Sequence, residues 1–166
     1  LGAGEMTGAV SDWAQNAVSH AKQWGLLAGT SLNANAAITR GQFARLLVNT
    51  AYGLGSWVDL SQPQTEAARL ALMMGDAYGN FNADGTLTRE MAAVVLTRLW
   101  RLTGDALASD ESVLWQFADA SSISDWAREG VCVATTAGLI SGTGSGFSPA
   151  GTLTCEQAVT LLARLY

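Results

Sequence analysis

Charged residues are scarce in this chain of 166 residues: they make up 14% of it, against about 25% in an average soluble domain. Basic residues are the rarer sign, nine against 14 acidic ones, and Lys22 is the only lysine among them. Because no basic stripe is available to neutralise phosphates, the sequence argues against nucleic acid as a partner. The low charge, combined with a hydrophobic content of 49%, also excludes intrinsic disorder.

Long apolar runs are absent, and cysteine is rare. No stretch reaches the roughly 18 uninterrupted apolar residues of a membrane span, and the start LGAGEM has neither a charged segment nor the apolar segment of a signal peptide. We therefore expect no membrane insertion. Cys132 and Cys155 show no metal-ligand spacing, so we expect two buried thiols, with a disulfide between them as the minor alternative.

Glycine and tryptophan are plentiful instead. There are 18 glycines against 2 prolines, which predicts many tight turns between short elements. Six tryptophans are many for this length. Some must lie in the core, and the excess suits a surface that contacts carbohydrate.

An internal repeat organises the chain. Three segments align, each with an apolar residue seven positions before a threonine: Leu32 to Thr39, Phe81 to Thr88, and Phe147 to Thr154. After each threonine, apolar residues recur at the i, i+3, i+4 spacing of an amphipathic helix. The sequence therefore predicts three equivalent helices in the same register.

The threonines are expected to cap these helices. Thr39 with Gln42, and Thr154 with Gln157, have the spacing of a capping box, in which the hydroxyl accepts an amide of the first turn and the glutamine reaches back. Thr88 is followed three positions later by Met91, so we expect a cap there without the box.

A second helix precedes each of these elements and ends in a glycine turn. The first copy runs from Ser11-Asp12-Trp13-Ala14 to Gly25-Leu-Leu-Ala-Gly29, and the third from Ser124-Asp125-Trp126-Ala127 to Gly138-Leu-Ile-Ser-Gly142. The middle copy is degenerate, because it begins at Ser61-Gln-Pro63, lacks the Trp-Ala pair and is expected to end near Met73-Met74-Gly75.

The predicted fold is all-α, with a repeat unit of helix, glycine turn, short extended loop and helix. We place the copies at residues 8–52, 56–101 and 115–166 of a single 1–166 unit, with a linker-like insertion at 102–114. One copy cannot bury both of its apolar stripes alone, so the three are expected to pack around a shared core.

The ordered set of motifs resembles a triplet of S-layer homology (SLH) domains. The aromatic-x-Asp entry reads Phe117-Ala-Asp119, the Phe-x-Pro loop reads Phe147-Ser-Pro149, and the Trp-Ala start and glycine turn are those given above. The start of the second helix appears in three variants: Ile38-Thr-Arg-Gly-Gln42, Leu87-Thr-Arg-Glu-Met91 and Leu153-Thr-Cys-Glu-Gln157.

The resemblance implies a fold and a function. Such triplets form a pseudo-threefold structure with a central three-helix bundle and three prongs separated by grooves. They attach surface proteins non-covalently to secondary cell-wall polysaccharide, commonly a pyruvylated one. The resemblance thus implies an extracellular, wall-associated module of a larger surface protein, with no cofactor and no catalytic role.

It also implies a set of ligand-binding residues. These occupy the Thr-Arg pair, the Trp-containing helix start and the glycine turn, and in this sequence they are Arg40, Arg89, Asp12, Trp13, Gly29, Gly75, Asp125, Trp126 and Gly142. The two arginines fall in the first turn of a predicted helix, where the macrodipole disfavours a cation, so a bound carboxylate would relieve the conflict. Cys155 takes the third arginine position and cannot make such a contact, which predicts a weak or inactive third groove.

Several alternatives stay open. Trp13 and Trp126 are equally compatible with core positions, and the glycines can be turn formers only. Asn80 to Asp84 imitates the start of a calcium loop, but Met91 stands where the bidentate Glu is required. An enzyme is disfavoured because no nucleophile motif is present and the single histidine, His20, is expected to face solvent. An interaction or self-assembly module without sugar binding is the remaining rival.

Overall fold

The chain divides into two compact units. The computed structural model describes residues 2–75, 78–104, 110–144 and 146–165. Unit 1 comprises Leu1–Leu87 with Leu153–Tyr166, and unit 2 comprises Thr88–Thr152. The boundaries between the units, at 87/88 and 152/153, lie just before the second helix of the second and of the third repeat. Neither unit therefore consists of whole repeats.

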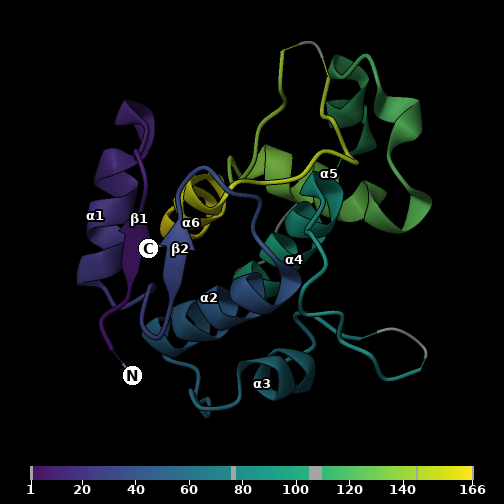
Figure 1. The fold of residues 1–166 in the computed structure, drawn as a ribbon. Helices are drawn as coiled ribbons and strands as arrows, with labels where there is room; N and C mark the ends of the chain where they lie inside the picture. The colour runs from purple at the N-terminus through teal and green to yellow at the C-terminus, as the bar shows by residue number, and fades with distance from the viewer. Residues whose placement is uncertain (1, 76–77, 105–109, 145, 166) are drawn as a thin grey trace. The chain divides into compact units, whose positions relative to one another are not determined.

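Unit 1 holds both ends of the described chain and a small sheet (Figure 1). Its elements are β1 (Glu5–Thr7), the 3-10 turn η1 (Asp12–Ala14), α1 (Gln15–Gln23), β2 (Ser31–Asn33), α2 (Arg40–Gly53), α3 (Pro63–Arg69) and α6 (Cys155–Ala163). The two strands are parallel, with Glu5 opposite Ser31 and Thr7 opposite Asn33. The pattern of the sequence predicts an extended loop where β2 lies but does not predict its partner β1.

Unit 2 contains α4 (Arg89–Arg101), the 3-10 helices η2 (Glu111–Gln116) and η3 (Ala120–Ser122), and α5 (Asp125–Thr136). The helix η2 begins inside the expected linker 102–114, of which residues 105–109 lie outside the described part of the chain. Taken together, the elements of the two units make the protein mostly helical, as the all-α prediction states.

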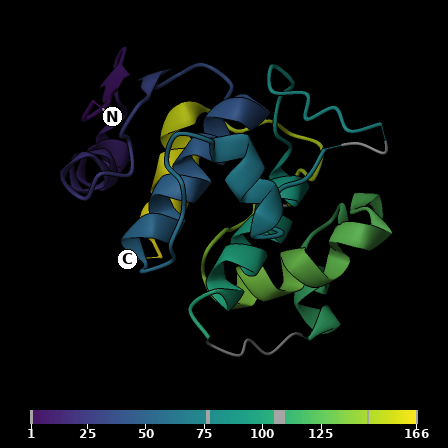
Figure 2. The ribbon, with the colours of Figure 1, turned by 90° about the horizontal axis from the view of Figure 1, so that it is seen from below.

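Helices pack across the repeat boundaries in both units. Within unit 2, α4 of the second repeat packs against α5 of the third. Within unit 1, α2 of the first repeat packs against α3 of the second, and α6 of the third packs against α1 of the first; α6 also lies beside α2 (Figure 2). The compact building block is therefore the second helix of one repeat with the first helix of the next.

The threonine caps occur as expected from the sequence. The hydroxyl oxygens of Thr39, Thr88 and Thr154 accept hydrogen bonds from the amides three residues later, at 3.1, 3.3 and 3.3 Å. Capping boxes are complete at Thr39 and Thr154, where a glutamine accepts the threonine amide in return. These caps fix where α2, α4 and α6 begin.

The first helix of every repeat ends in the same hydrogen-bonded turn. In each, an amide donates to the carbonyl five residues earlier, from Leu26 to Ala21, from Leu72 to Ala67 and from Leu139 to Ala134. The turn needs one residue in the left-handed region, supplied by glycine in the first and third copies and by Ala71, with φ 56°, in the second. The expected end of this middle helix near Met73 is therefore wrong, because α3 ends at Arg69.

Both cysteines are buried thiols, as the sequence indicated, and they are not joined by a disulfide, so that alternative is wrong. His20 is exposed as expected and lies against the Trp24 ring, with 5.2 Å between ring centroids. None of the helices built from the described residues is both long and apolar enough to cross a membrane.

Candidate functional site

Arg40 fastens the loop of the second repeat to the start of α2. Its Nε donates to the Phe81 carbonyl at 3.1 Å and its Nη2 donates to the Met74 carbonyl at 3.0 Å, while the guanidinium lies 5.4 Å from the centre of the Phe81 ring. The main chain docks in parallel, because the Arg40 amide donates to Gly85 at 2.7 Å. This brings Arg40 together with the turn that contains Gly75, both of them expected site residues.

Arg89 makes the same set of contacts in unit 2. Its Nε donates to the Phe147 carbonyl at 2.9 Å, its Nη2 donates to Ser141 at 2.6 Å, and its guanidinium lies 5.1 Å from the Phe147 ring centre. The Arg89 amide donates to Gly151 at 2.8 Å. The arrangement found at Arg40 therefore recurs, and it joins Arg89 to the turn containing Gly142.

The two arginines differ in their electrostatic surroundings. Arg89 is only 8% exposed, and burial lowers its pKa below the ordinary value while the nearby Asp119 carboxylate opposes the shift. Arg40 is half-buried, and no carboxylate among the described residues pairs with it. Of the two, Arg40 therefore has the less compensated charge.

The loop of the first repeat is closed without an arginine, because Cys155 stands at the third arginine position. The Cys155 amide donates to Ala36 at 2.9 Å, as the equivalent arginine amides do in their own loops. In place of a guanidinium, Asn49 Nδ2 donates to Ala28 at 2.9 Å and the Thr7 hydroxyl of β1 donates to Leu32 at 3.3 Å. Burial raises the pKa of the Cys155 thiol, so it carries no charge at neutral pH.

At two of the three arginine positions, the following residue is a glutamate that anchors a Trp-containing helix start. Glu156 accepts hydrogen bonds from the Ser11 amide and hydroxyl at 2.9 and 2.7 Å, and Glu90 accepts the equivalent pair from Ser124 at 2.9 and 2.7 Å. The first repeat has Gly41 at this position and cannot provide such an anchor. Such an anchor from the first repeat would hold the helix start of the middle repeat, which is the copy that lacks the Trp-Ala pair.

The expected tryptophans lie on the surface. Trp13 and Trp126 are each 58% exposed, which decides against core positions for both. Asp12 and Asp125 beside them are exposed as well. In unit 2, Asp125 lines a hollow of about 370 Å³ with Glu111 and Arg128, whereas Trp126 lines a separate hollow of about 150 Å³ on the α4 side.

The glycine positions are explained by close approach of the backbone. A Cβ at Gly142 would lie 2.6 Å from the Phe117 ring, and one at Gly75 would lie 2.8 Å from the Asn80 carbonyl. Both glycines are therefore required by the turns that the arginines hold. A direct contact with ligand is not needed to account for them.

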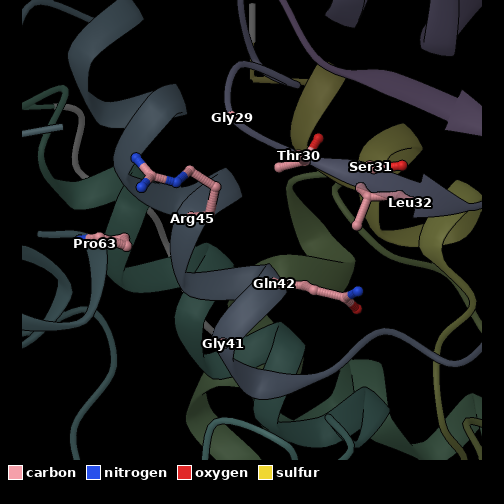
Figure 3. A pocket seen from close by; sticks show the side chains of 8 residues that line it. All are labelled: Gly29, Thr30, Ser31, Leu32, Gly41, Gln42, Arg45 and Pro63. Atoms are coloured by element: carbon pink, nitrogen blue, oxygen red, sulfur yellow. The ribbon is translucent and has the colours of Figure 1, made fainter. Parts of the chain in front are cut away.

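Gly29 borders a further pocket, in unit 1, of about 320 Å³ (Figure 3). It is lined by Gly29, Thr30, Ser31, Leu32, Gly41, Gln42, Arg45 and Pro63. Arg45 reaches from α2 toward Pro63 and donates through Nη1 to the Leu60 carbonyl. The repeat pattern does not single out Arg45, because its counterparts six residues after the other two threonines are Val94 and Thr160.

The sequence interpretation also missed the role of Asp119. Its carboxylate accepts the amides of Phe147 and Ser148 at 2.8 and 2.9 Å, so the aromatic-x-Asp entry of the third repeat holds the loop on which Arg89 stacks. The entry motif was the signal for this role.

Among the described residues, His, Cys, Asp and Glu side chains form no group of three that could hold a metal ion.

These features define a class of protein: tandem helix–loop–helix repeats in which the start of one repeat's second helix clamps the loop of the next. The SLH (S-layer homology domain) family model matches residues 7–44 and 116–159, and the chain is an SLH domain protein. The two matches fall on the first and third repeats, and the degenerate middle repeat has none. No curated protein matches the chain. The family match identifies a cell-surface anchoring module of a kind that typically binds cell-wall polymers.

Proposed function

We propose that this chain anchors a larger surface protein to the bacterial cell wall by binding a pyruvylated secondary cell-wall polysaccharide. The observation that carries the proposal is the arginine arrangement found twice, at Arg40 and at Arg89. In each case the described hydrogen bonds engage Nε and Nη2, so Nη1 retains donors for a ligand carboxylate. The module acts outside the cell and acts by binding, without catalysis.

The proposal includes a pseudo-threefold arrangement with a central three-helix bundle and three prongs. Its support is the order in which the repeats engage one another. The second helix of repeat one docks on the loop of repeat two at Gly85, that of repeat two on the loop of repeat three at Gly151, and that of repeat three on the loop of repeat one at Ala36. Such a series returns to its starting point, as a threefold arrangement requires.

A second function is favoured by one specific observation. Both guanidinium groups already donate to two backbone carbonyls and stack on a phenylalanine, which gives each a structural role that needs no ligand. An SLH-type module that binds proteins, or that assembles with copies of itself, would keep these contacts. The two functions differ in whether the wall polymer is required.

Co-sedimentation with purified cell-wall sacculi tests the proposal. The protein is expected to pellet with native sacculi and to remain in solution with sacculi stripped of secondary polymer. The double variant Arg40→Ala with Arg89→Ala is expected to lose native binding. Because both side chains also hold loops, circular dichroism melting must first show that this variant is folded.

A matched control removes the same charge elsewhere. Lys22 and Arg164 are exposed cations that line none of the hollows described above, and Lys22→Ala with Arg164→Ala should leave sacculus binding unchanged. Equal binding of the wild-type protein to native and stripped walls would contradict the proposal and support the second function.

A further inference from the structure

Arg45 has the surroundings of a ligand-binding residue, and the repeat pattern does not account for it. Its side chain projects from α2 and lines a pocket together with the Gly29–Leu32 segment and Pro63 (Figure 3). The volume of about 320 Å³ is within the range of small-molecule sites and suits a sugar ring with a substituent.

The charge of Arg45 has no counter-charge in the described part of the chain. The ion pairs found there join Arg69 to Glu66, Arg101 to Glu129 and Arg128 to Glu111. Arg45 instead donates from Nη1 to the uncharged Leu60 carbonyl, and burial lowers its pKa. A half-buried cation without a counter-ion is disfavoured by desolvation, and an anion in the pocket would remove that penalty.

The pocket offers one further donor beside the guanidinium. The Oε1 atom of Gln42 accepts the Thr39 amide in the capping box, which leaves its Nε2 protons for another partner. Gly29 and Gly41 leave room for a ligand because they have no side chain, but their amides already donate to Gly2 and Ala83 at 2.9 and 2.8 Å. The Ser31 hydroxyl, on the strand β2, donates to the Glu5 carboxylate at 3.4 Å. A cation beside a neutral amide donor matches a carboxylate carried on a sugar ring.

The counterpart of Arg45 in unit 2 carries no charge. Val94 occupies the position of Arg45, and Gly130 of α5 packs so closely on it that a Cβ on Gly130 would lie 2.8 Å from Val94 Cα. Val94 is 8% exposed and borders the smaller hollow of about 150 Å³ that Trp126 also lines. The second repeat therefore lacks a cation at the position where Arg45 supplies one in the first.

We propose that Arg45 is a specificity-determining residue, which selects sugars that carry a carboxylate in the pocket of unit 1. The inference rests on the proposed function and adds to it the residue that reads the acidic group. Arg45 thereby has a different role from Arg40, whose guanidinium holds the loop of the second repeat through hydrogen bonds.

Titrations with two matched probes, followed by NMR on the ¹⁵N-labelled full chain, test this inference. The probes are a methyl glycoside with a 4,6-linked pyruvate ketal and the same glycoside without it. The wild-type protein is expected to bind the charged probe at least about tenfold more tightly and to shift the amides of Gly29, Ser31 and Gly41. Arg45→Met keeps much of the side-chain stem and should abolish the preference, whereas Arg45→Lys should retain part of it.

The control variant is Arg164→Met, which removes an equal charge at an exposed position outside the pocket and should keep the wild-type preference. A preference that survives in folded Arg45→Met would overturn the inference, as would a wild-type protein that binds neither probe or binds both equally. Sacculus co-sedimentation of the wild-type protein separates this failure from failure of the proposed function. If the protein still pellets with native walls only, the anchoring function stands without Arg45 as its selector.

Discussion

Single residues decide how each loop is closed. Arg40 and Arg89 use the same donors on equivalent carbonyls. The loop of the first repeat meets Cys155 in place of an arginine, and Asn49 together with Thr7 of β1 donates to it instead. The arginines were predicted as site residues from their repeated position. Asp119 and Arg45 could not be predicted in the same way, because neither role recurs at the equivalent positions of the other repeats.

Asp119 gives the third loop a dependence on pH. The Phe147 amide is the main cause that lowers the Asp119 pKa, with the Ser148 amide and Arg89 as further contributions and burial opposing them. A carboxyl group whose pKa is lower in the folded than in the unfolded protein stabilises the fold fully at pH values above its unfolded pKa, about 3.9 for Asp. This stabilisation is lost as the pH falls through the folded pKa.

We expect Asp119→Asn to lower the free energy of unfolding by about 1 kcal/mol at pH 7, a modest amount because water partly screens the carboxylate. The difference from the wild-type protein should shrink below pH 4, as the native carboxylate is protonated. Urea unfolding at several pH values measures both effects. Asp84→Asn, on an exposed loop position, is the control, and a difference that grows toward acid would contradict the prediction.

At the level of elements, local sequence determined the helix starts. Threonine caps and their glutamine partners place the beginnings of α2, α4 and α6 where the repeat predicts them. The end of α3 was predicted less well, because no glycine marks the turn at Ala71. The β1–β2 pair was not predicted, since it joins segments distant in the sequence and each strand is only three residues long.

Ala71 is expected to be strained, because an L-residue in the left-handed region is disfavoured by about 1 kcal/mol or more. The equivalent turns use Gly25 and Gly138. Ala71→Gly should therefore raise the free energy of unfolding, by about 0.5–1 kcal/mol after the greater chain entropy of glycine is subtracted. Thermal and urea unfolding measure the gain. Ala68→Gly, inside α3, should instead destabilise the protein, and a loss of stability in Ala71→Gly would show that the turn is unstrained.

At the level of the whole molecule, each compact unit combines parts of different repeats. Unit 1 is completed by the last helix of the chain, since α6 packs on α1 and α2. Ala158, Val159, Leu161 and Leu162 of α6 are buried, and Glu156 holds the Ser11 helix start. The repeat as written in the sequence is thus not the unit that packs.

Deletion of residues 153–166 should therefore destabilise the opposite end of the chain. Each buried aliphatic side chain of α6 contributes roughly 1.5–3 kcal/mol, so the sum is comparable to the whole stability of a domain. Hydrogen exchange is expected to show loss of amide protection in α1. Full-length Glu156→Gln isolates the contribution of the carboxylate and should cause a smaller loss; unchanged protection of α1 in the deleted chain would contradict the prediction.

Sequence alone determined the repeat, the helices and their caps, and the arginines of the loops, because each of these depends on residues a few positions apart. It also predicts that an acidic ligand would be held by particular arginines, since the net charge of -5 gives no general attraction. Only the tertiary structure decided that Trp13 and Trp126 are exposed, that Glu90 and Glu156 anchor those helix starts, and that Arg45 faces an open pocket. These features depend on which helix of another repeat lies opposite, and that pairing is set by packing between distant segments.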